Sequence, residues 1–387
     1  MPINVKVKRL FVLPTLVGQG VSALASIVLV AVLARKLSST DYANYVLLTT
    51  LVAFGNAAIG TAVGTANASR AAEGHSSVAK LGWIVAASGL IVLPFTWLFA
   101  PTSDWQARVA CGMAVSACVF SEAKLGTLLG RKRLKMFGAL LILLSTVQIA
   151  SSVLLVLLFP NVTSPLLGLV IANVVVGVVI ISIESRARTL KSISPSGGLA
   201  FSGIGIANLA LWILASGDRV VLGHDVSPAR LASYAITYGI IDRFYRTIST
   251  AEVNRTLGAS FEGVRTGVAV KKSMYLSIVG CLVVSFGLLI HPLISLLTGG
   301  RYGLDLSNNW ILVLGISLMA LSAPLYVKAM AFKRGKEAAI AAILAATIDI
   351  VGDIIFVPHL GVLAACIFTL LGYGVWILGL WILIRKR

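Results

Sequence analysis

The chain has 387 residues, of which 58% are hydrophobic and only 12% are charged. Soluble globular proteins carry about 25% charged residues, so this composition excludes an ordinary soluble protein and indicates a protein of the lipid bilayer. The formal net charge is +18, from 32 Lys and Arg against 14 Asp and Glu. In a soluble chain this excess would suggest a nucleic-acid partner. In a membrane protein, the positions of the basic residues decide what the excess of positive charge indicates.

Twelve apolar stretches are long enough to span a membrane, for which a helix needs about 20 mostly apolar residues. We place the spans at 10–34, 43–65, 79–100, 108–130, 136–159, 165–183, 198–222, 233–257, 273–297, 309–332, 337–357 and 361–384. The first stretch lacks a small-residue cleavage site, so we interpret it as a retained helix and not as a signal peptide. The connections are short, so we expect no soluble domain on either side.

The distribution of Lys and Arg among the connections predicts the orientation, because cytoplasmic loops are rich in both residues. With the N-terminus in the cytoplasm, most basic residues outside the spans fall on the cytoplasmic side, and the outer loops at 160–164 and 358–360 have none. The sequence therefore predicts cytoplasmic N- and C-termini and an even number of spans. The excess of positive charge becomes a topological signal, and we expect no nucleic-acid partner.

The polar breaks between spans indicate an internal repeat. The end of the first span, at 33–45, resembles the end of the seventh, at 222–234, at an offset of 189 residues. Two further pairs follow in the same order: 130–135 with 332–337 at an offset of 202, and Pro160 with Pro358 at an offset of 198. Pro160 and Pro358 are each expected to open the outer turn before the last span of a half.

The repeat predicts the fold. Each half has six spans, so both halves enter the membrane in the same direction and are expected to be related by a pseudo-two-fold axis along the membrane normal. We therefore expect an all-α polytopic membrane protein with two six-helix bundles, residues 1–190 and 191–387. The four cysteines lie inside apolar stretches without a CxxC spacing, which indicates neither a disulfide framework nor a metal site.

Charged residues inside the spans are the candidates for function, because each costs about 2.5–3.5 kcal/mol at mid-bilayer on insertion scales. The basic ones are Lys124, Arg219, Arg243, Arg246, Arg255 and Lys328. The acidic ones are Glu122, Asp218, Asp242, Glu252, Asp349 and Asp353. At this cost the side chains are expected to face the interior of the protein and not the lipid.

Span eight, within 234–260, holds five of these charges and is expected to line a wet interior. Asp242 and Arg246 stand four residues apart and can pair on one helix face, and Glu252 and Arg255 stand three apart. For the first pair, mutual neutralisation is as good an interpretation as a functional role.

Arginine and aspartate favour two different chemistries. A guanidinium stays charged and binds phosphate through two hydrogen bonds, so Arg243, Arg246 and Arg255 together favour an anionic or phosphorylated substrate. Asp349 and Asp353 lie one turn apart on one face of span eleven and are candidates for a proton or cation relay, with a structural pair to Arg219 as an equal alternative.

Two features near the span ends and interiors have simpler interpretations. Lys124 and Lys328 lie near the cytoplasmic ends of spans four and ten, at nearly corresponding positions, where extension of the side chain to the membrane surface is the favoured interpretation. Pro14, Pro94 and Pro324 fall inside spans and predict kinks, because proline lacks the backbone donor.

Three segments carry a family resemblance. Residues 30–55 form a helix, an acidic and aromatic turn and a second helix; 215–236 contain an Asp-Arg helix end followed by a serine turn and a tyrosine; and 293–303 contain a leucine-rich Gly-x-x-Tyr stretch. In these features the chain resembles the polysaccharide flippases (O-antigen, Wzx-type) of the multidrug/oligosaccharidyl-lipid/polysaccharide (MOP) exporter superfamily. The superfamily's peptidoglycan-precursor flippases have two extra helices, which argues against that branch.

The resemblance implies a function and roles for the embedded charges. Such proteins move an undecaprenyl-pyrophosphate-linked oligosaccharide, the repeat unit of O-antigen, lipopolysaccharide or exopolysaccharide, to the periplasmic leaflet of the bacterial inner membrane by alternating access. The implied substrate-binding residues are Lys124, Arg219, Arg243, Arg246, Arg255 and Lys328. The implied residues for coupling to H⁺ or Na⁺ are Asp218, Asp242, Glu252, Asp349 and Asp353. A polysaccharide polymerase and glycosyltransferases are implied as partners.

Two alternatives remain open. A cation-coupled exporter of small organic cations has the same fold and would be favoured by a cavity rich in acids and poor in arginine. A membrane-embedded polysaccharide enzyme would need a substantial outer loop with catalytic residues, whereas the outer loops here are short and His224, His291 and His359 are scattered singly. We therefore expect a transporter and not an enzyme.

Overall fold

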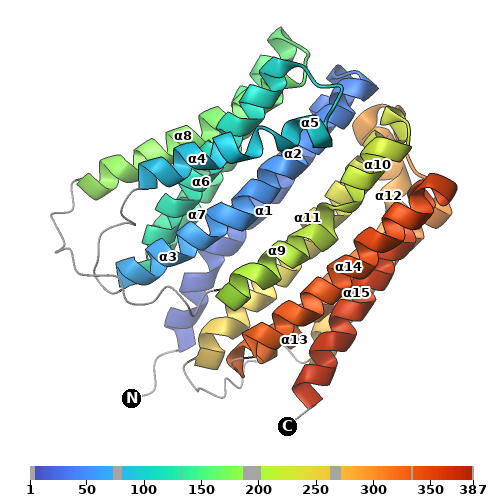
Figure 1. Ribbon diagram of the computed structural model, residues 1–387. Helices are drawn as coiled ribbons and strands as arrows, with labels where there is room; N and C mark the ends of the chain where they lie inside the picture. Colours follow the sequence, from blue (N-terminus) through green and yellow to red (C-terminus); the bar gives the residue numbers. More distant parts are fainter. Residues whose placement is uncertain are drawn as a thin grey trace. The chain divides into compact units, whose positions relative to one another are not determined.

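The protein is all-helical in the computed structural model, which describes residues 5–72, 81–131, 133–185, 202–261, 272–332 and 334–385. Figure 1 shows the helices in chain order. Each of the twelve predicted spans is helical over most of its described residues. The chain divides into two compact units, Met1–Gly205 and Ile206–Arg387.

Helices of the first part of the chain are α1 (Val5–Lys36), α2 (Ser39–Gly55), the π-helical turn η1 (Asn56–Gly60), α3 (Thr61–Ala72), α4 (Leu81–Val92), α5 (Phe95–Phe99), α6 (Trp105–Gly130), α7 (Leu134–Leu158) and α8 (Thr163–Ser185). Those of the second part are α9 (Ser202–Ser216), α10 (Asp218–Asp225), α11 (Pro228–Phe261), α12 (Lys272–Thr298), α13 (Leu306–Ala331), α14 (Gly335–Leu360) and α15 (Val362–Arg385).

Three predicted spans are interrupted, each for a local reason. Pro94 separates α4 from α5, which confirms the kink expected where a proline removes a backbone donor. The α9–α10 span breaks at Gly217, and the α2–α3 span contains η1, whose last bond runs from the Thr61 N–H to the Asn56 carbonyl. Pro324 lies inside the unbroken helix α13.

The two units have the same internal packing order. In the first unit α6 packs against α2, α3, α4 and α8, while α7 packs against α1 and α8. In the second unit α13 packs against α11, α12 and α15, while α14 packs against α10 and α15. Each unit is therefore a bundle of six helical segments with the fourth segment at its centre.

Backbone hydrogen bonds give the register of the repeat at the α6–α7 and α13–α14 turns. The Arg131 N–H donates to the Thr127 carbonyl (3.1 Å), and the Phe332 N–H donates to the Lys328 carbonyl (3.0 Å). The offset at this turn is thus 201 and not 202, so Lys328 corresponds to Thr127 and lies one turn away from the equivalent of Lys124.

The predicted pairing of Pro160 with Pro358 is wrong in structural terms. Pro160 lies in the turn between α7 and α8, whereas Pro358 lies inside α14, which continues to Leu360. Pro358 therefore removes one i→i−4 hydrogen bond from the last turn of α14 and does not open the turn to α15.

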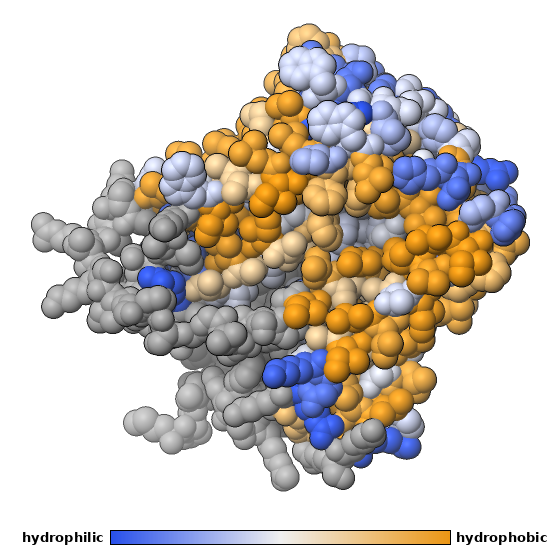
Figure 2. Space-filling model, viewed as in Figure 1, coloured by the Kyte–Doolittle hydropathy of each residue, from blue (hydrophilic) through white to orange (hydrophobic). Residues whose placement is uncertain are grey.

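The chain is a polytopic membrane protein. Ten of the described helical stretches are long and apolar enough to cross a membrane. Large apolar side chains are exposed along them, among them Trp83, Leu90, Leu296 and Ile354, and apolar residues cover much of the surface in view in Figure 2. Exposed apolar surface of this extent is stable in lipid and not in water.

Candidate functional site

The break at Gly217 places the carboxylate of Asp218 at the first turn of α10, where the helix dipole favours negative charge. Asp218 is fully buried. Its Oδ1 accepts the Arg219 backbone N–H at 2.7 Å, and its Oδ2 accepts the hydroxyl of Tyr234 on α11. The Tyr234 hydroxyl also lies 3.4 Å from the Thr369 hydroxyl of α15. Three helices therefore meet at one carboxylate.

Asp349 and Asp353 on α14 complete what we call the acidic cluster, together with Asp218. Both side chains are fully buried, and no carboxylate oxygen of either accepts a hydrogen bond from any residue that the structure describes. The charge of Asp218 acts on both. Because buried charge without a partner is strongly unfavourable, this arrangement requires an added proton or cation.

The guanidinium of Arg219 interacts electrostatically with Asp218. Its Cζ lies 4.6 Å above the ring centroid of Tyr238, a cation–π contact. Among the described side chains, no ion pair joins Arg219 to Asp349 or Asp353. An ion pair of Arg219 with Asp349 or Asp353, one of the two alternatives from the sequence, is thus absent among the described side chains.

The Asp242–Arg246 pair has the i, i+4 geometry that the sequence predicts. The Arg246 Nε donates to Asp242 Oδ2 at 3.1 Å, and Nη2 donates to Oδ1 at 2.9 Å. The side chain of Arg246 is 54% exposed, against 16% for Asp242. The carboxylate therefore holds one edge of the guanidinium and leaves its Nη1 edge available to an anion.

The other predicted basic residues differ in position and burial. Arg243 is half-buried on the same helix, and Lys328 is exposed in the last turn of α13. Lys124 is half-buried on α6, in the other unit. The side chains of Glu252 and Arg255 lie outside those that the structure describes.

Three tyrosines form a buried network that the sequence analysis missed: Tyr234, Tyr238 and Tyr373. The hydroxyls of Tyr238 and Tyr373 lie 3.3 Å apart, and the rings of Tyr234 and Tyr238 lie 5.9 Å apart. Tyr373 interacts electrostatically with Asp242 and Arg246. The tyrosine network therefore lies between the acidic cluster and Arg246. The available signal was the spacing of Tyr234 and Tyr238, four residues apart on the polar span eight.

The first unit holds a different environment. Glu122 on α6 lies against α3, where a Cβ on Gly64 would come within 3.2 Å of its Cγ. Beside it, the buried amide of Asn67 donates to the Ala123 carbonyl at 2.9 Å. No group of three or more His, Cys, Asp and Glu among the described residues of the chain is arranged to hold a metal ion.

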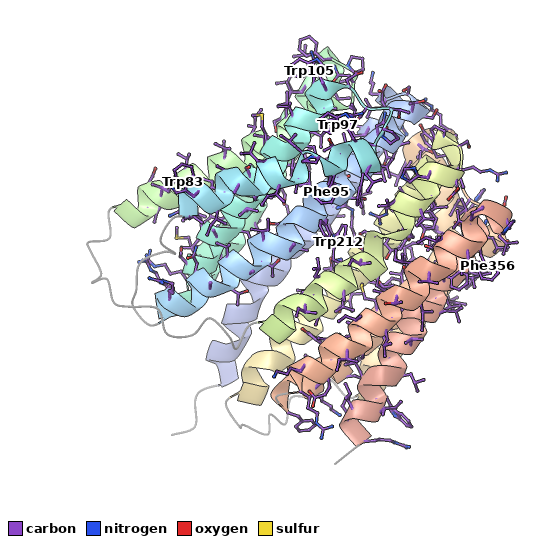
Figure 3. All side chains as sticks on the ribbon, viewed as in Figure 1. Trp83, Phe95, Trp97, Trp105, Trp212 and Phe356 are labelled. Carbon is purple, nitrogen blue, oxygen red and sulfur yellow. The ribbon has the colours of Figure 1, made fainter. Side chains whose placement is uncertain are left out.

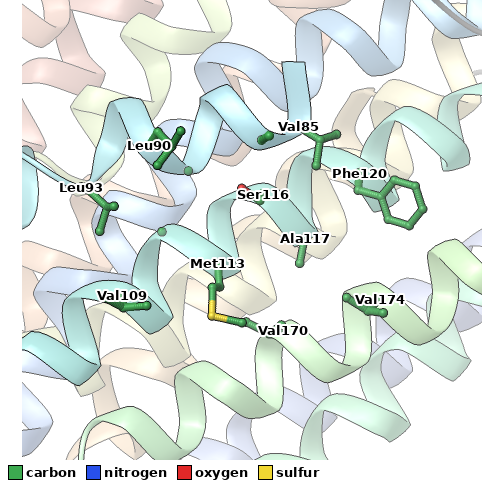
Figure 4. Close-up of a pocket in the computed structure, with 13 residues that line it drawn as sticks. Val85, Leu90, Leu93, Val109, Met113, Ser116, Ala117, Phe120, Val170 and Val174 are labelled. Atoms are coloured by element: carbon green, nitrogen blue, oxygen red, sulfur yellow. The ribbon is translucent and has the colours of Figure 1, made fainter. Parts of the chain in front are cut away.

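An apolar groove runs along the first unit between α4, α6 and α8 (Figure 4). It encloses about 430 Å³. Ser116 is the one lining residue with a polar side chain, and none of the predicted site residues lines it. The groove is thus chemically separate from the acidic cluster.

Comparison with known proteins identifies the fold. No family model and no curated protein matches the chain. The lipid II flippase MurJ in an inward closed conformation matches with a TM-score of 0.68 and 13% identity, over 97% of this chain and 87% of that one. An inward-facing multidrug resistance MATE family transporter of the MOP superfamily matches with a TM-score of 0.59 and 16% identity, over 94% and 93%. A MATE protein in complex with MaD5 matches at 0.60 and 14%, over 96% and 93%.

At these identities the likeness establishes the fold alone. The chain has the fold of MOP-superfamily transporters, which confirms the fold-level part of the resemblance read from the sequence. These structural neighbours are transporters and not enzymes.

Proposed function

We propose that the chain is a transporter that moves an undecaprenyl-pyrophosphate-linked oligosaccharide from the cytoplasmic to the periplasmic leaflet of a bacterial inner membrane. Residues 1–190 and 191–387 act as two bundles related by a pseudo-two-fold axis along the membrane normal, with both termini cytoplasmic. The bundles alternate access to a central site, and H⁺ or Na⁺ drives the cycle. The fold, shared with a lipid II flippase, supports a lipid-linked substrate.

The acidic cluster is the observation that carries the proposal. Asp349 and Asp353 are buried and have no hydrogen-bond donor among the described residues, so each cycle of cation binding and release changes the charge at the packing face of α14. A buried carboxylate without a partner readily takes up a proton, because neutralisation removes the cost of burying its charge. Binding there stabilises one packing of α10, α14 and α15 over another.

The substrate's anionic part is assigned to Arg246. Its guanidinium is oriented by the two hydrogen bonds that it donates to Asp242 and remains half exposed. A pyrophosphate reaching the free edge would form charge-assisted hydrogen bonds, which are about twice as strong as neutral ones. Arg219, Arg243 and Arg255 are the further basic groups proposed for this path, with Lys124 and Lys328 at its cytoplasmic end.

A cation-coupled exporter of organic cations is the second candidate. MATE transporters share the fold, and the acidic cluster could serve an organic cation directly. The half-exposed guanidinium of Arg246 disfavours this candidate, since it would repel a positively charged substrate.

Proteoliposomes loaded with a fluorescent undecaprenyl-pyrophosphate oligosaccharide provide the test. Arg246→Ala should abolish flipping while insertion persists, and Arg230→Ala, which removes an exposed arginine of the same helix, should leave it unchanged. The double change Asp349→Asn and Asp353→Asn should remove the response to a proton or sodium gradient, with Asp305→Asn as the exposed control. Normal flipping by Arg246→Ala, or an unchanged gradient response, would reject the corresponding role. Uptake of an organic cation in place of the lipid would favour the second candidate.

A further inference from the structure

The apolar groove of the first unit has a defined floor and two walls. Its floor is α6, and α4 and α8 lie on either side of α6 (Figure 4). The lining residues run along α6 from Val109 to Phe120, a length of about 17 Å at the helical rise. This is roughly half of the hydrocarbon thickness of a bilayer. The groove is therefore long enough to hold part of an extended hydrocarbon chain.

Small residues on α4 and α6 line part of the groove. Ala86, Gly89, Gly112 and Ala117 are among the lining residues. A Cβ on Gly89 would come within 2.5 Å of the Gly112 carbonyl oxygen, so α4 and α6 cross in backbone contact. This contact fixes α4 against α6. The floor on α6 has larger side chains at Val109, Met113 and Phe120 and small ones at Gly112 and Ala117, so it is an uneven apolar surface that accommodates a methyl-branched chain.

One end of the groove is closed. The ring of Phe120 lies against α8 at Gly177, where a Cβ would come within 2.1 Å of the ring. An occupant must therefore extend toward the other end, where Leu93 and Val109 line the groove.

The rims of the groove face the membrane. Leu90 on α4, Met113 on α6 and Val174 on α8 line it and are each more than two-fifths exposed. Neighbouring apolar side chains on the same helices, Ile91 and Val178, are also exposed. The opening is thus continuous with the lipid-facing surface, and hydrocarbon is the phase that has access to it.

The open end of the groove has the residues of a membrane interface. Trp97 and Trp105 are exposed beside it on α5 and at the start of α6 (Figure 3), and tryptophan is enriched at the level of lipid headgroups. The Cζ atom of Arg108, the residue next to Val109, lies 4.5 Å from the ring centroid of Trp97, and only 6% of Arg108 is exposed. Its Nε and Nη2 donate to the carbonyls of Ser103 and Pro101, whereas Nη1 has no hydrogen-bond partner among the described residues. Arg108 does not itself line the groove, but its positive charge lies at this end, one residue from Val109.

We propose that the groove binds the isoprenoid chain of a polyprenyl-phosphate lipid, with the phosphate at the Arg108 end. A single groove suits a lipid with one hydrocarbon chain, whereas a phospholipid would place one chain in the groove and leave the other outside. The proposal rests on the proposed function, because the cargo supplies the polyprenyl chain. In the proposed orientation the open end faces the periplasm, so the groove holds the chain of the delivered lipid.

Photo-crosslinking tests the groove without requiring transport. Benzoylphenylalanine is placed at Met113 in the groove and, as a matched control, at Val178 on the lipid-facing surface outside it. The full-length protein is reconstituted in phosphatidylethanolamine and phosphatidylglycerol vesicles with a minor fraction of undecaprenyl phosphate. Adducts at Met113 should be enriched in undecaprenyl phosphate about tenfold over its vesicle fraction, which corresponds to ~1.4 kcal/mol. Adducts at Val178 should match the vesicle composition.

Equal adduct compositions at the two positions, or enrichment of phospholipid at Met113, would overturn the proposal. Filling the groove with Ala117→Phe should remove the enrichment, and Ile171→Phe, on the exposed surface outside the groove, should retain it. Should Ala117→Phe fail to insert, Val174→Trp fills the groove from its rim, and enrichment that persists in the filled variant also refutes the site. Because the readout needs no gradient, enrichment without flipping would refute the transport function and keep the groove.

Discussion

The hydroxyl of Tyr234 offers a direct measure of what holds the acidic cluster together. It donates the one side-chain hydrogen bond that reaches Asp218 from the described residues. Hydrogen bonds to charged groups contribute about 1.5–3 kcal/mol, and a buried acceptor that loses its donor bears the cost. Tyr234→Phe should therefore lower the free energy of unfolding by roughly 2 kcal/mol.

The same helix supplies a matched control. Tyr245 on α11 is as deeply buried as Tyr234, but its hydroxyl has no hydrogen-bond partner among the described residues. Removal of an unsatisfied buried hydroxyl costs nothing and relieves a desolvation penalty. Tyr245→Phe should thus leave the stability unchanged or raise it slightly. Both substitutions conserve the ring, so the difference between them isolates the hydrogen bond.

Reversible unfolding in mixed micelles, followed by tryptophan fluorescence, gives both free energies. A double-mutant cycle with Asp218→Asn then separates the Tyr234–Asp218 interaction from other effects of each change. A coupling energy of about 1–2 kcal/mol is expected for groups in direct contact. Equal stabilities of the Tyr234→Phe and Tyr245→Phe variants, together with additivity in the cycle, would refute the view that this bond fixes the cluster.

Two further predictions concern packing and capping. Gly352→Ala should destabilise the protein markedly, because the new Cβ would lie 2.1 Å from the Phe368 ring. Gly374→Ala, which has open space around it, should instead gain about 1 kcal/mol of stability from helix propensity. Thermal melting in detergent compares the two variants, and equal shifts of the melting temperature would contradict the packing described. Ser38→Ala should cost about 1 kcal/mol, because Ser38 caps α2 by accepting the Asp41 N–H at 3.0 Å; an unchanged melting temperature would show that this cap contributes little.

Much of the fold is predictable from the sequence because each span satisfies its own backbone hydrogen bonds. Length and hydropathy alone place all twelve spans on helix. The Asp242–Arg246 pair was equally accessible, since its spacing on one helix fixes the geometry. The repeat was found from the polar turns, but its register at the α13–α14 turn came out one residue off, because two basic clusters align almost equally well at offsets of 201 and 202.

The acidic cluster could not be predicted as a unit. Asp218 and Asp349 stand far apart in the sequence, and only the packing of α10 against α14 brings their charges together. Tyr238 and Tyr373 were missed for a related reason: a buried tyrosine in an apolar helix resembles ordinary core until its hydroxyl partner on another helix is known. The break at Gly217 was missed because one glycine within an apolar run is common in membrane helices.

The π-helical turn at Asn56 sets which side of α3 meets α6. One extra residue in a helix advances the following side chains by about 100° around the axis. With it, Gly64 and Asn67 face α6, where they meet Glu122 and Ala123. Without it, both residues would rotate away from α6. A Cβ on Gly60 would lie 2.0 Å from Asn56 Oδ1, so a larger residue there would displace the Asn56 amide at the start of this turn. The position of one extra residue in a helix thus decides which residues of α3 are the neighbours of Glu122.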